Sequence, residues 1–258
     1  MPPGHNRVDL VARLKRAGKL LEPISEFYKD EVRELGRELG IPEEIVQKNP
    51  FPGPGLAIRC LTSPLDTPLV DKMDSVRKYI PDNRYRKEAK ELSLVTVGVQ
   101  GDNRTESHVI VIAGRIPFDK LETVSTNIIN NLQAVNRVTY LLRAKGNMHN
   151  ARIVQREITA ERLDLLREAD FKVRAYIGEY AVNNDIWQFP VILIPLQFTS
   201  GETIVLRPVS SINGMTAEFT KLSAGLAKGI ANEVLSIPGI DAVLYDVTNK
   251  PPATIEWE

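Results

Sequence analysis

The sequence has little of what marks secreted, membrane or metal-binding proteins. Its 258 residues include one cysteine, Cys60, which excludes an internal disulfide and fits a reducing compartment. The opening stretch, MPPGHNRVDL, lacks the apolar run of a signal peptide, and no later segment reaches the roughly 18 apolar residues that a membrane span needs. We therefore expect a cytoplasmic protein with no membrane partner.

An excess of one charge and the common ligand motifs are absent as well. The 33 basic residues are balanced by 33 acidic ones, whereas nucleic-acid binders usually show a basic excess. No GxxxxGK(S/T) loop and no GxGxxG after a strand occurs, which argues against a self-contained nucleoside triphosphate site. The three histidines, His5, His108 and His149, have no partners at metal-ligand spacing. We expect no nucleic-acid partner and no metal site.

The single cysteine ends the strand-like stretch LAIRC, and no neighbouring residue suggests a base that would activate it. A buried structural thiol is therefore favoured over a nucleophile at Cys60.

The residues up to about 50 are expected to form two helices. In SEFYKDEVRELGRELG, apolar side chains at Tyr28, Val32, Leu35 and Leu39 recur at helical spacing, with charged residues off the stripe. Gly40 is a suitable stop, and PEEIVQK can begin the next helix. Such a pair could bind DNA or pack on a neighbouring domain. The balanced charge favours packing.

The stretch NPFPGPGLAIR, residues 49–59, is rich in proline and glycine. Prolines fix φ and remove hydrogen-bond donors, so this stretch predicts a stiff connector between domains.

Beyond the connector, one order of elements occurs twice. The first copy runs LSLVTVGV, HVIVIAG, a helix over 119–133 and RVTYLL, and the second runs VILIPLQF, TIVLRPV, a helix over 217–235 and DAVLYDV. A further helix is expected before each copy, around 69–79 and 159–177. Chance similarity of two α+β stretches is the alternative. The order predicts an α+β fold of two tandem α-β-β-α-β subdomains, each a small sheet covered by helices.

The main helices expected in the two copies share one apolar spacing. The matched sets are Leu121, Val124, Ile128 and Leu132 in the first copy, and Phe219, Leu222, Leu226 and Ile230 in the second.

Two short stretches combine polar side chains with features of a binding site. In the turn GVQGDNR, glycines permit close backbone approach, Asp102 can accept from hydroxyls, and Arg104 offers a planar fork for phosphate. In WQFPV, Gln188 sits between two aromatic residues and must find partners for its amide. Both stretches also have an explanation without a ligand. GVQGDNR can be a hairpin turn, and the amide of Gln188 can bond to backbone groups.

The final stretch, NKPPATIEWE, is unusual for a chain terminus. Pro251 and Pro252 are expected to hold the chain extended and to present Lys250 on a stiff stalk. Trp257 is expected to pack, which would bring Glu256 near the lysine. A binding site and an anchored edge segment are equally compatible with these residues.

Four of these stretches together resemble one family. KDEVRELGRELGIPEEIVQKNPFPGPGLAIR, TVGVQGDNR, WQFPV and KPPATIEWE, in this order, are similar to the C-terminal part of glutamine-hydrolysing GMP synthetase. The resemblance, to the longer form of that family, implies a remnant of an ATP-pyrophosphatase domain and linker (1–53). It further implies a first dimerization subdomain (54–150) and a second one that carries a C-terminal substrate-binding segment (151–258).

The resemblance also implies a reaction and a site. In that family, glutamine supplies ammonia, ATP with magnesium adenylylates xanthosine monophosphate (XMP), and ammonia displaces AMP to give GMP. The dimerization region contributes to XMP binding and to a homodimer. The residues implied for XMP binding are Asp102, Arg104, Gln188, Lys250, Ile255 and Glu256, with Ile255 contributing only its backbone.

The sequence departs from the family by lacking a glutaminase domain and the ATP loop. We therefore expect no catalytic residue here, no ATP or magnesium bound by this chain alone, and no activity without separately encoded glutaminase and ATP-pyrophosphatase portions. The alternative is a non-catalytic oligomerization or regulatory module that has lost ligand binding.

Overall fold

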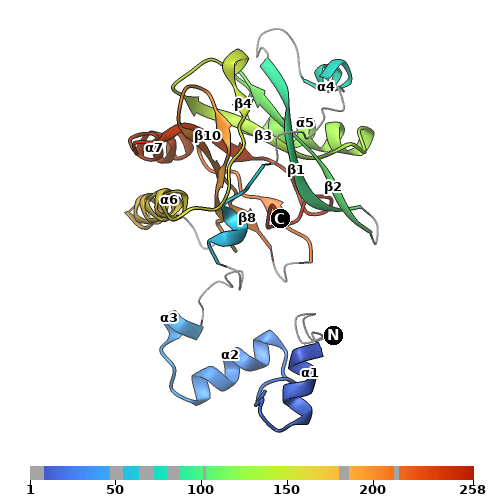
Figure 1. The fold of residues 1–258 in the computed structure, drawn as a ribbon, viewed down its shortest axis with the longest axis vertical. Helices are drawn as coiled ribbons and strands as arrows, with labels where there is room; N and C mark the ends of the chain where they lie inside the picture. Colours follow the sequence, from blue (N-terminus) through green and yellow to red (C-terminus); the bar gives the residue numbers. More distant parts are fainter. Residues whose placement is uncertain are drawn as a thin grey trace. The chain divides into compact units, whose positions relative to one another are not determined.

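The computed structural model describes residues 9–46, 55–63, 73–80, 88–100, 103–179, 186–211 and 215–258. Its internal contacts divide the chain into two compact units, Met1–Pro50 (unit 1) and Phe51–Glu258 (unit 2). Figure 1 shows short helices in unit 1 and a sheet with helices in unit 2. The domain boundaries predicted at residues 53 and 150 remain predictions.

Along its described residues, 9–46, unit 1 contains three helices: α1 (Asp9–Arg16), α2 (Lys29–Glu38) and α3 (Glu43–Val46). The first of them was not expected. Gly40 follows α2 with a φ of 72°, the left-handed conformation that ends helices and favours glycine. The expected helix, glycine turn and second helix are thus present.

The apolar stripe of α2 is only partly covered. Val32 and Leu35 are half-buried, whereas Tyr28 and Leu39 are each 70% exposed. Further large apolar side chains of unit 1 are also exposed: Leu21, Ile24, Phe27, Ile41 and Ile45.

Unit 2 is built on a six-stranded sheet in the order β1-β2-β3-β10-β7-β5. The strands are β1 (Glu88–Gln100), β2 (Asn103–Ala113), β3 (Val135–Ala144), β10 (Ile240–Asp246), β7 (Glu202–Leu206) and β5 (Val191–Ile194). Two short pairs accompany it: β4 (Arg152–Ile153) with β6 (Leu196–Gln197), and β8 (Val209–Ser210) with β9 (Glu218–Phe219).

Strand pairing repeats across the sheet. β1 pairs antiparallel with β2, and β2 pairs parallel with β3; likewise β5 pairs antiparallel with β7, and β7 pairs parallel with β10. The two halves join where β3 and β10 pair antiparallel. The α+β class is confirmed, but the expectation of two separate small sheets is wrong. Pairing at this seam satisfies backbone groups that would otherwise form two open edges.

Helices cover one face of the sheet. They are α4 (Met73–Tyr79), α5 (Phe118–Asn131), α6 (Ala160–Glu179) and α7 (Ala224–Leu235). Alternate residues of each strand point to this face, so Ile110 and Ile112 of β2 join the same core as Leu121 of α5, Leu166 of α6 and Ile230 of α7. This core extends across both copies of the repeat.

The opposite face of the sheet is covered by segments outside the long helices. Val109 and Val111 of β2 belong to a second apolar cluster with Leu61, Phe198 and Trp257. Trp257 is fully buried, and Figure 1 places the C-terminus within unit 2. The chain end is therefore part of the core.

The helix expected over 217–235 begins later. Ser223 is its N-cap, because its Oγ accepts a hydrogen bond from the Leu226 N–H at 3.2 Å, and Phe219 belongs to β9 instead. The helices of the two copies therefore align at a different offset from the expected one. Buried residues at the same relative spacing are Leu121, Val124, Ser125 and Ile128 in α5, and Ala227, Ile230, Ala231 and Val234 in α7.

Two other expected elements are interrupted. VILIPLQF splits into β5 and β6 at Pro195, which has no N–H for a ladder. The strand-like LAIRC contains a 3₁₀ turn, η2 (Ala57–Arg59). Cys60 itself is fully buried, as expected for a structural thiol, and burial raises the pKa of that thiol.

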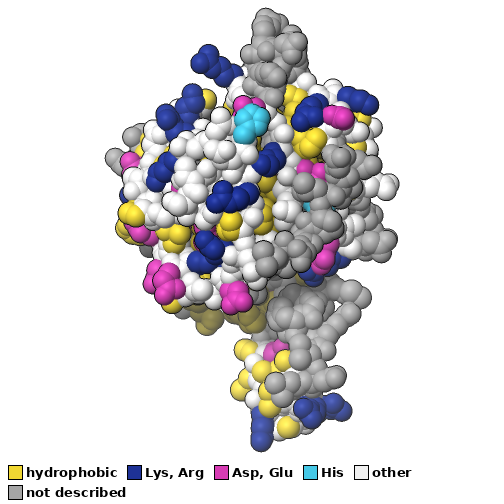
Figure 2. Space-filling view, turned by 45° about the horizontal axis from the view of Figure 1, so that its top comes forward, with side chains coloured by type: hydrophobic (Ala, Val, Ile, Leu, Met, Phe, Trp, Pro, Cys, Tyr) yellow, Lys and Arg dark blue, Asp and Glu magenta, His cyan; other side chains and the backbone are white. Residues whose placement is uncertain are grey.

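The surface in Figure 2 carries basic and acidic side chains spread over the same face, in keeping with their equal numbers. Across the described ranges, no helix is long and apolar enough to span a membrane.

Candidate functional site

The C-terminal segment, residues 249–258, lies beside the last residues of β1. The Val97 N–H donates to the carbonyl oxygen of Trp257 at 3.0 Å, and the Val99 N–H donates to that of Pro252 at 2.6 Å. Between them, Gly98 and Ala253 form an isolated antiparallel bridge. Residues 252–257 are therefore attached to the edge strand of the sheet.

Lys250 is fixed through its backbone. Its N–H donates to the Ala217 carbonyl at 2.7 Å, and the Ala217 N–H donates back at 3.0 Å. The two peptide bonds that follow, before Pro251 and Pro252, are both cis, and these prolines form a turn. The expected extended stalk is thus wrong, since the lysine lies on a short bridge before a turn.

Gln188 reaches the same region from a distant part of the chain. Its backbone exchanges hydrogen bonds with Val209, at 3.2 Å and 2.8 Å, and the neighbouring Trp187 N–H also donates to Val209. Trp187 packs against a small apolar cluster of Val209, Ala217 and Ile255. This cluster brings the segments carrying Gln188, Lys250 and Ile255 together.

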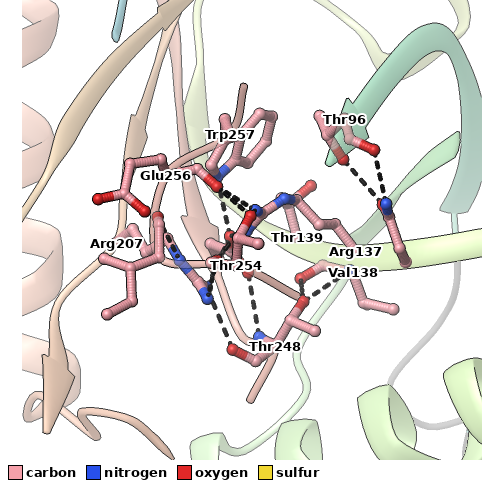
Figure 3. Close-up of polar contacts among 12 residues, drawn as sticks. Thr96, Arg137, Val138, Thr139, Arg207, Thr248, Thr254, Glu256 and Trp257 are labelled. Atoms are coloured by element: carbon pink, nitrogen blue, oxygen red, sulfur yellow. Dashed lines mark hydrogen bonds and ion pairs between the residues drawn. The ribbon is translucent and has the colours of Figure 1, made fainter. Parts of the chain in front are cut away.

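Ile255 and Glu256 differ in what they can offer a ligand. The Ile255 side chain is 4% exposed, and its carbonyl accepts from Arg207 Nε at 3.0 Å. The Glu256 carbonyl accepts from Arg137, whereas Figure 3 shows the Glu256 carboxylate pointing away from Arg137. The Glu256 carboxylate acts on Arg137 and Arg207 through its charge, which tends to raise the pKa of both.

The turn between β1 and β2 is only partly described. Asp102 lies outside the described residues. Arg104, exposed at the start of β2, pairs in register with Val99, the residue that donates to Pro252. Arg104 is therefore one strand away from the C-terminal segment.

Gly98 has a clear steric role in this arrangement. A Cβ added there would lie 2.9 Å from the Pro252 carbonyl oxygen and 2.9 Å from Asn136 Nδ2. The sequence suggested that glycines in this turn admit a ligand, but at Gly98 the close neighbour is the C-terminal segment itself.

We predict that Gly98→Ala lowers the free energy of unfolding by about 1–3 kcal/mol, because the added methyl must displace the backbone of Pro252. Urea denaturation measures this change. Gly225→Ala in α7 is the control, since a Cβ there meets nothing within 4 Å and alanine favours a helix. Equal stability of the G98A variant and the wild type would contradict the close packing of the segment.

Sequence reasoning missed the charges that hold the segment. Arg137 of β3, Arg207 after β7 and Asp246 at the end of β10 are fully buried; we call them the buried charge cluster. Asp246 Oδ2 lies 3.0 Å from Arg137 Nη1 and 2.8 Å from Arg207 Nη1. A signal existed: each is a lone charged residue in an apolar stretch, VNRVTYLL, TIVLRPV and VLYDV.

The electrostatics of the cluster follow from burial. Loss of water, and then repulsion from Arg207, lower the pKa of Arg137 to about 9, while Asp246 opposes this change. Burial also lowers the pKa of Arg207. Both guanidiniums remain charged near neutral pH, since Asp246 and several carbonyl oxygens surround them.

His108 lies among structural hydrogen-bond partners. Within the described ranges, no group of three His, Cys, Asp or Glu side chains could hold a metal ion. His108 Nδ1 lies 3.1 Å from the Leu92 carbonyl oxygen and 3.4 Å from Glu91 Oε1, and His5 is outside the described residues.

Comparison with protein families gives two matches. Residues 176–257 match the model described as GMP synthase C terminal domain. The matched residues include Gln188 and nearly the whole C-terminal segment. Residues 17–89 match the model described as NAD synthase.

Individual relatives extend over almost the whole chain. A protein of Leptospira interrogans named "Probable GMP synthase (glutamine-hydrolyzing)" is 38% identical over 262 residues, covering 98% of this chain and 42% of the relative. "GMP synthase (glutamine-hydrolyzing)" of Dictyostelium discoideum is 28% identical, with 98% and 42% covered. The protein of that name from Crocosphaera subtropica is 30% identical, with 93% and 29% covered. The chain thus spans at most 42% of these three relatives.

Proposed function

Because the chain belongs to the GMP synthase family and corresponds to its C-terminal part, we propose that it binds XMP and self-associates in the ATP-dependent amination of XMP to GMP. ATP and magnesium would act in the complete enzyme, at the ATP loop that this sequence lacks.

The convergence of Gln188, Lys250 and Ile255 on one small cluster carries this proposal. The three residues come from separate stretches, and Val209, Ala217 and Trp187 join those stretches by backbone hydrogen bonds and apolar packing. A shared location of several polar groups is what a ligand site requires.

The chemistry of each side chain suggests its role. Lys250 suits the phosphate of XMP as a point charge, and Arg104 can add a planar fork. Gln188 and Glu256, with Asp102, suit ribose hydroxyls or the polar edges of the base. At Ile255 we propose the backbone N–H, because the side chain is buried and the carbonyl already accepts from Arg207.

Unit 1 supports the proposal of a partner. Its residues 17–50 fall within the NAD synthase match, and several of its large apolar side chains are exposed, with Leu21 at 90%. Such exposure is typical of surfaces that pack against protein. We propose that they pack against the remainder of an ATP-pyrophosphatase domain, whether on the same or on a separately encoded chain.

Lys250→Ala tests the XMP site. We expect about tenfold weaker XMP binding or more, the usual effect of losing a charge-assisted hydrogen bond. Titration calorimetry with XMP measures this, with glutaminase and ATP-pyrophosphatase portions supplied in trans. Lys228→Ala, at an exposed position of α7, is the matched control and should bind XMP as the wild type does.

The alternative, an oligomerization or regulatory module, gives a different result. It predicts a dimer by light scattering that binds no XMP even when the other portions are present. Wild-type protein behaving in that way would refute XMP binding and leave self-association standing.

A further inference from the structure

The C-terminal segment lacks regular secondary structure. After β10 ends at Asp246, residues 247–258 form no helix or strand, only isolated bridges at Lys250 and Ala253. Its conformation must therefore be held by hydrogen bonds outside regular secondary structure. Two buried arginines, Arg137 and Arg207, donate several of these hydrogen bonds to backbone carbonyl oxygens of the segment (Figure 3).

Arg137 binds the end of the segment. Its Nη2 lies 3.0 Å from the Thr254 carbonyl oxygen, 2.8 Å from Thr254 Oγ1 and 2.5 Å from the Glu256 carbonyl oxygen. The same nitrogen lies 3.1 Å from the Val97 carbonyl oxygen of β1. Arg137 thus ties the segment to the edge of the sheet.

Arg207 binds the chain on both sides of Lys250, at Thr248 just before the C-terminal segment and at Thr254 and Ile255 within it. Its Nη1 donates to the Thr248 carbonyl at 3.1 Å, its Nη2 to the Thr254 carbonyl at 2.8 Å, and its Nε to the Ile255 carbonyl at 3.0 Å. A planar fork with several donors can hold three carbonyls at fixed relative positions, which a lysine ammonium cannot do.

The two arginines come from different copies of the repeat. Arg137 lies on β3 in the first copy, whereas Arg207 and Asp246 lie in the second. β3 and β10 pair directly at the seam of the sheet, which brings Arg137 to within 3.0 Å of Asp246 although the two are 109 residues apart in sequence. The first copy therefore reaches into the site of the second.

We propose that Arg137 and Arg207 are positioning residues of the XMP site, which hold Lys250, Ile255 and Glu256 in their binding arrangement through the backbone of the C-terminal segment. This inference rests on the proposed function. It also gives β3 of the first copy a role in ligand binding, in addition to the direct contacts proposed for Asp102 and Arg104.

The charges around the buried cluster largely balance. The two guanidiniums face the Asp246 carboxylate, and the charge of Glu256 also tends to raise the pKa of Arg137 and of Arg207. The two arginines therefore act on the segment through their hydrogen bonds to its backbone.

Arg137→Lys and Arg162→Lys separate positioning from stability. Arg162 is a buried arginine of the same unit, held by Glu202 at 2.7 Å and by the Leu61 carbonyl at 2.8 Å, without a described bond to the C-terminal segment. Both variants keep the charge and lose the fork. We expect R137K to weaken XMP binding about tenfold and R162K to leave it unchanged, at a temperature where both are folded. The full chain is used, with the missing portions supplied in trans.

Amide hydrogen exchange provides the second readout and does not depend on XMP. We expect faster exchange of residues 253–258 in R137K than in R162K, because only R137K loses the bonds to these carbonyls. Equal exchange in this segment, or equal XMP affinity of the two variants when the wild type binds XMP, would overturn the positioning role. No XMP binding by the wild type would refute the proposed function instead, and the exchange result would then decide whether the arginines hold the segment.

Discussion

Replacing Asp246 with asparagine is expected to lower the free energy of unfolding by about 3–5 kcal/mol. The carboxylate is fully buried and is the counterion of both Arg137 and Arg207. An asparagine would remove the carboxylate that lies within 3.0 Å of both buried guanidiniums, and desolvated charges without such a close counterion are costly. One amide oxygen cannot replace a carboxylate, because the amide nitrogen would face other donors.

Asp246 also organises groups besides the arginines. Trp257 Nε1 donates to its Oδ2 at 2.9 Å, and the Thr248 N–H donates to its Oδ1 at 3.0 Å. The substitution should therefore loosen the C-terminal segment as well as lower stability. Urea denaturation followed by tryptophan fluorescence detects both changes, since Trp187 and Trp257 are the two tryptophans and both lie in unit 2.

Asp164→Asn provides the matched control. Asp164 pairs with Arg167 on the surface of α6, and its side chain is 71% exposed. Exposed ion pairs contribute little, so we expect a change of about 0.5 kcal/mol or less. Similar losses for D246N and D164N would contradict the energetic importance assigned to the buried charge cluster.

Replacing Trp257 with alanine is the second large effect that we expect, a loss of about 3–5 kcal/mol. The indole is fully buried in the apolar cluster on the face of the sheet opposite the helices. Its ring also lies against Arg137, with the guanidinium carbon 5.1 Å from the ring centroid. Removing the ring leaves a cavity and takes away a donor to Asp246. Far-UV circular dichroism during urea denaturation gives the stability without relying on the removed fluorophore.

Trp257→Phe separates packing from hydrogen bonding. Phenylalanine keeps most of the buried apolar area and loses the N–H, so we expect a smaller loss of about 1–2 kcal/mol. If the W257F variant were as unstable as W257A, the contribution of Trp257 to stability would come from its hydrogen bond and not from packing. If instead W257A kept wild-type stability, the end of the chain would not be part of the core.

The elements of the fold were largely predictable, because each depends on a local pattern. The strands of HVIVIAG and DAVLYDV and the helix of α6 follow from apolar spacing and residue type. Boundaries were less predictable. Ser223 sets the start of α7 by accepting a hydrogen bond, and Pro195 ends β5 because it has no N–H to donate. The spacing of apolar residues contains neither signal.

The candidate site was predicted only as separate stretches. Resemblance to the GMP synthase family selected Gln188, Lys250 and Glu256, but the stretches became one location only through Val209 and Ala217. Asp102 lies outside the described residues, so its prediction stays open. Arg137 and Asp246 were not predicted, because a lone charge in an apolar strand does not identify its partner.

The sequence by itself determined the α+β class, the order of the main strands and helices of the two copies, the buried thiol of Cys60 and the family. The first three depend on composition and periodicity, which are local properties of the sequence, and the family depends on motifs that can be compared directly with those of known proteins. The tertiary structure decided that β3 and β10 join the two copies in one sheet and that Arg137, Arg207 and Asp246 meet beneath the C-terminal segment. Strand pairing across such distances depends on register and packing of the whole sheet, which no local pattern specifies.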